Sequence, residues 1–252
     1  SGTAADLGFA AVFDNSLDAV SDRDFVAEAL FDLALLGVPL SRIGEEVVLW
    51  STDEFGFLKL DDAYATGSSM LPQKKNPDIA ELARGRSGRL IGPLTAILTT
   101  LKGLPLAYNR DLQEDKEPLF DAVDQSVLAL GALSGLLASS RFVTDAMAAA
   151  ADSPYAAATD LAELLVERGT PFRDAHAIVG EIVRTALEGN GQMADLVTAH
   201  PALGPEAAAL LAPGVSVTRR TTRGGAGPVA VAAQLERFVE RLRQDGERVR
   251  GG

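Results

Sequence analysis

The sequence predicts an all-α protein, a bundle of long helices followed by a small helical domain. Hydrophobic residues make up 47% of the 252-residue chain and aromatic residues only 6%, while alanine and leucine are abundant, which favours helices over strands. Long segments repeat apolar residues at steps of three and four, and no run alternates convincingly as a strand. The composition turns alanine-rich after Arg141 and the expected helices become shorter, so we expect a bundle domain over 1–143 and a second domain over 144–252.

The first long helix is expected from Ser21 to about Trp50. Ser21 is followed three residues later by Asp24, in the manner of a capping box. Pro39 lies inside the apolar repeat and is expected to kink the helix or split it in two. A loop with short extended pieces is then expected over 51–66.

The second long helix is expected over 77–102. Asn76 is a suitable N-cap and Pro77 a suitable first helical residue, while Pro93 should bend the helix further along. Three glycines fall on one face and suggest close approach of another helix or a ligand: Gly85, Gly88 and Gly92.

An ordered loop over 103–114 and a third helix over about 115–140 complete the expected bundle. The uncharged run 125–140 is shorter than a membrane-spanning helix, so we interpret it as part of a buried bundle helix. The second domain is expected to contain a helix–turn–helix pair, a loop rich in proline, glycine and arginine, and a final helix: 156–168, 171–188, 213–228 and 229–248. Gly169 should end the first helix of the pair, with Thr170 capping the second and Pro171 as its first residue.

Charge and cysteine content narrow the possible partners. The net charge of −12 argues against nucleic acid or an anionic membrane as the main partner. The absence of cysteine excludes disulfides and thiolate metal sites and fits a reducing, cytoplasmic location. The chain begins with Ser-Gly-Thr rather than methionine, as a cut chain would.

The stretch 67–81, Gly-Ser-Ser-Met-Leu-Pro-Gln-Lys-Lys-Asn-Pro-Asp-Ile-Ala-Glu, is the strongest candidate for a site. Hydroxyls and ammonium groups lie on a flexible loop that enters a helix N-terminus, where free N–H groups and partial positive charge suit a carboxylate. From 74 to 116, eight basic and five acidic residues give a local charge of +3, which suits a small polyanion. A solvated surface loop and ordinary pairing of surface charges are the alternatives, while the spacing does not fit a phosphate-binding P-loop.

This stretch resembles the signature loop of the fumarase/aspartase superfamily, Ser-Ser-x-Met-Pro-x-Lys-x-Asn. The pattern falls on five positions: Ser68, Ser69, Pro72, Lys74 and Asn76. Leu71 stands where the family has methionine before proline, and Met70 comes one place early, an exchange of two flexible apolar side chains.

The segment 108–117, Tyr-Asn-Arg-Asp-Leu-Gln-Glu-Asp-Lys-Glu, is similar to a segment of argininosuccinate lyases and the related delta crystallins, and it separates them from fumarases and aspartases. The segments 169–176 and 216–220 are similar to the C-terminal domain of the same enzymes. The resemblance covers essentially the whole chain.

The resemblance implies catalytic roles for Ser68, Lys74 and Glu81. Ser68 matches the serine of proton transfer, Lys74 and Asn76 the residues that hold the substrate carboxylate, and Glu81 the acid that orients a catalytic histidine. A serine hydroxyl is too weak an acid to act as a base at neutral pH unless cations and helix N–H groups favour its alkoxide. The implied substrate-binding residues are Arg23, Ser69, Asn76, Tyr108, Gln113 and Lys116.

Neither of the two histidines, His176 and His200, lies in the sequence context of the family's catalytic histidine. We expect His176 to be a structural residue and His200 to be a capping or surface residue, and the chain to be the C-terminal portion of a lyase nearly twice as long.

The function that the resemblance implies is elimination of fumarate from argininosuccinate, leaving arginine, with no cofactor and no metal. It also implies a homotetramer whose active sites combine segments of different subunits. Two alternatives remain: another fumarate-releasing lyase of the superfamily, and a non-catalytic structural protein of the delta-crystallin kind.

Overall fold

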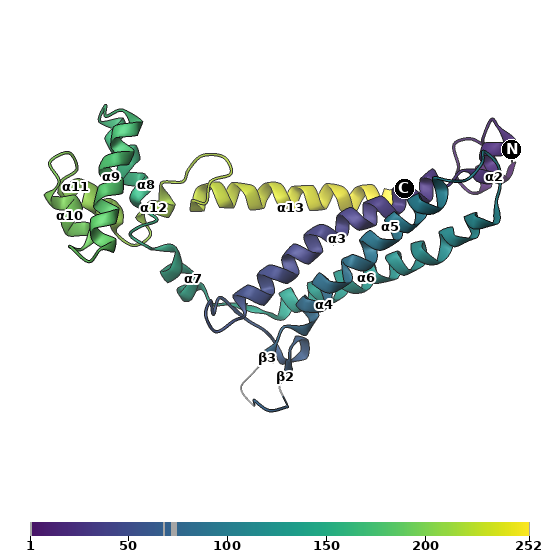
Figure 1. Ribbon diagram of the computed structural model, residues 1–252, viewed down its shortest axis with the longest axis horizontal. Coiled ribbons are helices and arrows are strands. Elements are labelled where there is room, and N and C mark those ends of the chain that lie inside the picture. The colour runs from purple at the N-terminus through teal and green to yellow at the C-terminus, as the bar shows by residue number, and fades with distance from the viewer. Residues whose placement is uncertain (1, 68, 72–74, 252) are drawn as a thin grey trace. The chain divides into compact units, whose positions relative to one another are not determined.

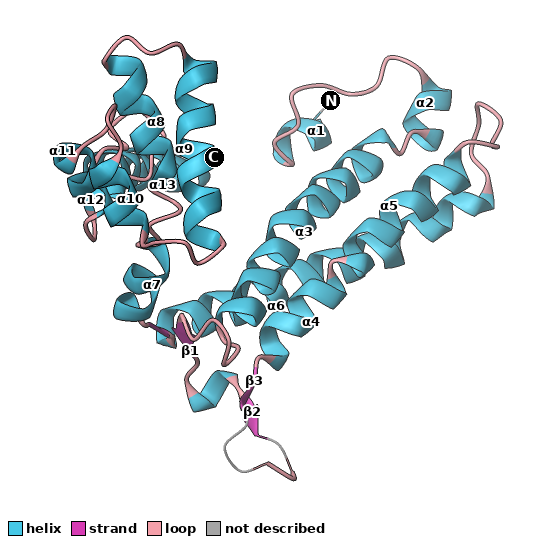
Figure 2. Cartoon of the chain, turned by 60° about the vertical axis from the view of Figure 1, so that its left-hand side comes forward, coloured by secondary structure: helices cyan, strands magenta, loops and turns pink. Residues whose placement is uncertain are grey.

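A computed structural model describes residues 2–67, 69–71 and 75–251 of the chain. Its regular structure is overwhelmingly helical, and each strand in the described residues is two residues long (Figures 1 and 2). The prediction of an all-α fold is confirmed. The chain divides into two compact units, Ser1–Val143 and Thr144–Gly252.

The first unit is an up-and-down helical bundle preceded by two short helices. The helices are α1 (Gly2–Asp6), α2 (Ser16–Ser21), α3 (Asp24–Trp50), α4 (Asp78–Arg86), α5 (Gly88–Leu101) and α6 (Lys116–Ser139), with 3-10 helices η1 (Asp62–Tyr64) and η2 (Arg110–Asp115). Antiparallel strand pairs join β1 (Leu58–Lys59) to β4 (Arg141–Phe142) and β2 (Thr66–Gly67) to β3 (Lys75–Asn76). Helix α3 packs against α4, α5 and α6, and its apolar repeat supplies core residues along its length: Val26, Leu30, Leu40 and Val47.

Helices α3 and α4 cross closely at Gly44. A Cβ atom on Gly44 would lie 2.6 Å from the carbonyl oxygen of Ala80, and backbone cannot move aside as a flexible side chain can. By contrast, a Cβ on Gly85, Gly88 or Gly92 would meet nothing within 4 Å. The predicted close approach at those three glycines is therefore not found among the described residues, and it occurs instead on α3.

Replacing Gly44 with alanine should lower the free energy of unfolding by about 1–3 kcal/mol, since the added methyl overpacks the helix crossing. The matched control is Gly131→Ala in the exposed middle of α6, where a Cβ meets nothing within 4 Å. Alanine there should stabilise the chain by about 0.5–1 kcal/mol through helix propensity. Urea denaturation measures both, and equal effects of the two substitutions would contradict the close crossing.

The predicted start of the first long helix was wrong. Ser21 ends α2 instead of capping α3, and its hydroxyl donates to the Leu17 carbonyl oxygen at 2.6 Å. Helix α3 begins at Asp24, whose backbone N–H donates to the Asp22 carboxylate. Pro39 does not split α3, which is continuous to Trp50 because its buried face packs against three other helices.

The second long helix also differs from its prediction. It is interrupted at Ser87, in a run that contains Gly85 and Gly88, rather than at Pro93, which lies inside α5. Serine and glycine pairs are common causes of such breaks. Asn76 belongs to β3 and caps nothing, because α4 begins at Asp78.

Helix α6 and the 3-10 turn before it form the one described segment long and apolar enough to cross a membrane, Arg110–Ser139, with a mean hydropathy of 1.4 in its most apolar window. Length and composition do not decide the matter, since core helices of soluble proteins pass the same test. Helix α6 packs against α3, α4 and α5, as expected of a bundle helix.

The second unit consists of short helices followed by one long helix. They are α7 (Thr144–Ala151), α8 (Ala158–Glu167), α9 (Phe172–Leu187), α10 (Met193–Ala199), α11 (Pro205–Ala208), α12 (Val215–Thr218) and α13 (Pro228–Gly251), with a 3-10 turn η3 (Ala209–Leu211). The predicted pair α8–α9 is confirmed, and Gly169 follows α8 with a φ of +94° that favours glycine. Thr170 does not cap α9, because Pro171 takes that position.

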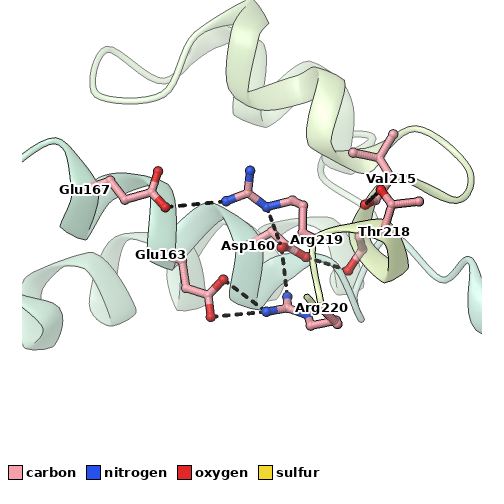
Figure 3. A network of polar contacts seen from close by, with 8 residues as sticks. Asp160, Glu163, Glu167, Val215, Thr218, Arg219 and Arg220 are labelled. Carbon is pink, nitrogen blue, oxygen red and sulfur yellow. Dashed lines mark hydrogen bonds and ion pairs between the residues drawn. The ribbon is translucent and has the colours of Figure 1, made fainter. Parts of the chain in front are cut away.

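A buried carboxylate joins α8 to the segment around α12. Asp160 is fully buried and accepts hydrogen bonds from Ser216 Oγ at 2.5 Å and Arg219 Nε at 3.0 Å. Its Oδ1 also forms an ion pair with Arg220 at 2.8 Å (Figure 3). Arg220 reaches Glu163 as well, at 3.1 Å. Burial by itself lowers the pKa of Arg220, but the hydrogen bond and charge of Glu163 and the charge of Asp160 outweigh it and raise the pKa.

Candidate functional site

Of the candidate residues in the 67–81 stretch, Asn76 and Glu81 lie around the start of α4. Ser68 and Lys74 lie outside the described residues. Ser69 is exposed, and Asn76 is half-buried in β3, opposite Thr66 of β2. Glu81 is exposed in the first turn of α4, on the helix whose N-terminus follows the loop.

A second group of candidate residues surrounds Asp115, a buried carboxylate in η2. Arg23 Nε donates to Asp115 Oδ2 at 2.5 Å, and Lys116 Nζ donates to Oδ1 at 2.7 Å. The Arg23 guanidinium also donates to the Asp22 carbonyl oxygen at 2.6 Å. Arg23 is thus held by partners within the chain, whereas the Lys116 side chain is 62% exposed and can still reach a ligand.

Burial by itself opposes ionisation of Asp115, but hydrogen bonds from Lys116 and Arg23 and their positive charges outweigh it and lower the pKa of Asp115. A carboxylate whose pKa is lower in the folded than in the unfolded state stabilises the fold above the unfolded pKa, about 4. This contribution should therefore be present at neutral pH and lost as the pH falls through the lower, folded pKa.

Tyr108 and Gln113 lie in the segment between α5 and α6. The Gln113 side-chain amide donates to the Tyr108 hydroxyl at 3.4 Å, and both side chains are exposed. Together with Lys116 they place a hydroxyl, an amide and an ammonium group within nine residues of the chain around η2, a set suited to a polar anionic ligand.

The candidate residues at the start of α4 and those around Asp115 lie at opposite ends of the bundle. Helix α3 begins next to Arg23 and runs for 27 residues, a length of about 40 Å. Helices α4 and α5 run back along it, from the β2–β3 pair at one end to the turn before η2 at the other (Figure 1). A single chain therefore does not bring Asn76 and Glu81 together with Arg23 and Lys116.

Both histidines belong to the second unit. His176 is exposed on α9, with its ring 6.1 Å from that of Phe172. His200 follows α10 as its C-cap, and its Nδ1 accepts a hydrogen bond from the Ala202 backbone N–H at 3.3 Å. The capping role expected for His200 is confirmed.

The positive charge counted between 74 and 116 is partly neutralised by acids from outside that stretch. Arg84 pairs with Glu45, and the hydrogen bond that it donates to this carboxylate is the main reason that the pKa of Arg84 is raised. Arg89 pairs with Asp121 at 2.5 Å. Ordinary pairing of surface charges, the alternative interpretation, therefore accounts for part of the basic cluster.

Two interactions near the candidate residues were not predicted. The motifs in the sequence pointed to Arg23 and Lys116 but not to Asp115, the carboxylate between them. The hydrogen bond from the Thr66 hydroxyl to the Asp78 carboxylate, beside the signature loop, was not predicted either. Asp115 directly precedes Lys116, which was a usable signal, whereas nothing in the sequence joins Thr66 to Asp78.

Comparison with known proteins identifies the family of this chain. Residues 3–92 match a general lyase family, and residues 155–218 match the family described as argininosuccinate lyase C-terminal. An argininosuccinate lyase of Frankia casuarinae is 56% identical over 239 residues, which cover 93% of this chain and 52% of that protein. One of Mycobacteroides abscessus is 54% identical over 244 residues, with 95% and 52% covered.

Solved structures agree with these matches. An EDDS lyase variant with bound fumarate superposes with a TM-score of 0.85 at 32% identity, covering 97% of this chain and 52% of that one. A fumarate lyase:delta crystallin of Brucella melitensis, at 20% identity and a TM-score of 0.60, shares the fold. The chain belongs to the argininosuccinate lyase family, within the fumarase/aspartase superfamily, and spans about half the length of the curated relatives that it matches.

Proposed function

We propose that the chain forms part of an argininosuccinate lyase, which eliminates fumarate from argininosuccinate and releases arginine. The observation that carries the proposal is the coexistence of the signature loop with the 108–117 segment, in a chain 53–56% identical to curated argininosuccinate lyases. A cytoplasmic location and the absence of a metal or cofactor are parts of the same proposal.

In the proposed reaction a base removes the proton from the carbon beside a substrate carboxylate. The electron pair of the broken C–H bond forms the double bond of fumarate as the carbon–nitrogen bond breaks. The pair of that bond stays on nitrogen, which takes up a proton from an acid as arginine leaves. Ser68 is the proposed base, and Lys74 and Asn76 hold the carboxylate as negative charge builds on it. Ser69, Tyr108, Gln113 and Lys116 bind the substrate.

We also propose that the active site combines residues of different protomers in a homotetramer. Asn76 and Glu81 lie towards one end of α3, a helix about 40 Å long, and Asp115 lies at the other end, so one small dicarboxylate cannot span both. Large apolar side chains are exposed on α3, among them Phe25, Phe31 and Leu35. Association through these faces would bury them and could bring opposite ends of two bundles together.

Assay of fumarate by its ultraviolet absorbance tests the function. The 252-residue chain should release no fumarate from argininosuccinate by itself, because its histidines, His176 and His200, lie outside the predicted site. Fumarate should appear when a second chain supplies the half of the Frankia casuarinae relative that this chain does not match. Turnover by the chain alone would refute the need for a second segment. A stable mixed assembly without turnover would instead favour the delta-crystallin-like alternative.

In the active assembly, Lys116→Met should lower kcat/KM by about 30-fold or more, because a desolvated charge contact to substrate is lost. Lys75→Met is the matched control, since Lys75 pairs only with the exposed Asp62 in the described structure and should affect kcat/KM less than about threefold. Urea denaturation should accompany the assay, since Lys116 also pairs with Asp115. Equal losses from the two changes would indicate general attraction of the anion rather than a specific contact.

A further inference from the structure

The two strands that flank the signature loop form a narrow base, here called the loop neck: β2 (Thr66–Gly67), β3 (Lys75–Asn76) and Asp78. Thr66 pairs with Asn76 and Gly67 with Lys75 in an antiparallel ladder. The Thr66 hydroxyl donates to the Asp78 carboxylate, which lies in the first turn of α4. The neck thus ties the residue before Ser68 to the residue after Lys74, and both to the helix start.

The loop neck is anchored in the bundle on both sides. Before β2, the Tyr64 hydroxyl occupies the space that a Cβ atom would need on Gly135 of α6. After β3, Ala80 of α4 is fully buried in an apolar cluster of the bundle core. Tyr64 and Ile79 pack against this cluster. Both ends of the neck therefore begin from fixed points on the core.

The ladder itself is too short to hold its own geometry, since even longer two-stranded hairpins are marginally stable in water. The Lys75–Asp62 ion pair is exposed on both sides and such pairs contribute little. The Thr66–Asp78 hydrogen bond is different, because its acceptor is charged and lies on a helix whose position is set by buried residues. Asp78 also lies in the first turn of α4, where a negative charge interacts favourably with the helix dipole.

We propose that Thr66 and Asp78 are positioning residues for the elimination reaction. Their hydrogen bond fixes the separation and register of Gly67 and Lys75, and through them where the chain enters and leaves the stretch that carries Ser68 and Lys74. The inference rests on the proposed function for its catalytic consequence, while the geometry of the neck can be tested without any turnover.

The test compares Thr66→Val, Asp78→Ala and the double variant, in the assembly with the complementing half. Each single variant should raise the hydrogen-exchange rates of the Thr66, Gly67, Lys75 and Asn76 amides and lower kcat by on the order of tenfold or more, with KM nearly unchanged. The double variant should be no worse than either single variant, because both remove one interaction. Thr66→Ser should restore both readouts, since it keeps the hydroxyl.

Thr99→Val is the matched control, because the Thr99 hydroxyl donates to the Thr95 carbonyl oxygen within α5 and its loss should leave exchange at the neck and kcat unchanged. Unchanged exchange at the neck in Thr66→Val and Asp78→Ala would overturn the proposal, as would independent, multiplying losses of kcat. If the parent assembly releases no fumarate, the proposed function fails, and the exchange rates alone then decide whether this bond holds the neck.

Discussion

Replacing Ser68 with alanine should reduce fumarate release in the active assembly by at least about 100-fold, since general base catalysis typically contributes a factor of this size or more. The expectation comes from the match of Ser68 to the proton-transferring serine of the superfamily, because Ser68 lies outside the described residues. The free energy of unfolding should change little, as loss of one hydroxyl from a loop seldom affects stability.

Ser139→Ala provides the control for this experiment. The Ser139 hydroxyl donates within its own helix, to the Gly135 carbonyl oxygen at 2.9 Å, so its loss should change neither kcat nor stability appreciably. Ser68→Ala with parental kcat would remove Ser68 from the mechanism. A loss of kcat matched by a loss of stability would assign Ser68 a structural role instead.

The helical architecture could be predicted because it depends on patterns that are local in sequence. The apolar repeat of the first long helix places Val26, Leu30 and Val47 in the core, as a bundle helix requires. Gly169 likewise ended its helix as predicted, because positive φ is a property of a single residue.

Helix ends and breaks were predicted less well, because they depend on competition between contacts. Ser21 and Asn76 are good caps by residue type, yet one donates back into its own helix and the other pairs with a strand. Pro39 costs one backbone hydrogen bond, which the packing of α3 against three helices outweighs.

The residues of the candidate site were predicted from motifs. Their separation into two groups at opposite ends of the bundle was not predicted. Tyr108, Gln113 and Lys116 are close in sequence, but no sequence pattern states their distance from Asn76. That distance follows from the length and direction of α3, α4 and α5. Asp160 was missed for a related reason, since its partners Arg219 and Arg220 come nearly sixty residues later.

Replacing Asp160 with alanine should destabilise the second unit by about 3 kcal/mol, since removing one partner from a buried ion pair leaves its charges uncompensated. Asp160 is fully buried, whereas the side chains of Arg219 and Arg220 are each 31% exposed. The arginines therefore retain some hydration and contacts to Glu167 and Glu163, which places the expected loss at the lower end for a buried pair.

Two further variants distinguish the effect of the buried charge of Asp160 from the effect of its side-chain volume and from that of an exposed ion pair in the same unit. Asp160→Asn keeps the side-chain volume and one accepting oxygen, so its loss of stability should be intermediate. Glu206→Ala removes an exposed partner of Arg168, 3.2 Å away in the same unit, and should cost less than about 1 kcal/mol. Urea denaturation of the three variants compares their free energies of unfolding, and hydrogen exchange along α8 locates the effect. An Asp160→Ala loss no larger than that of Glu206→Ala would mean that α8 and α12 are held together by their apolar contacts, with the buried carboxylate contributing no net stability.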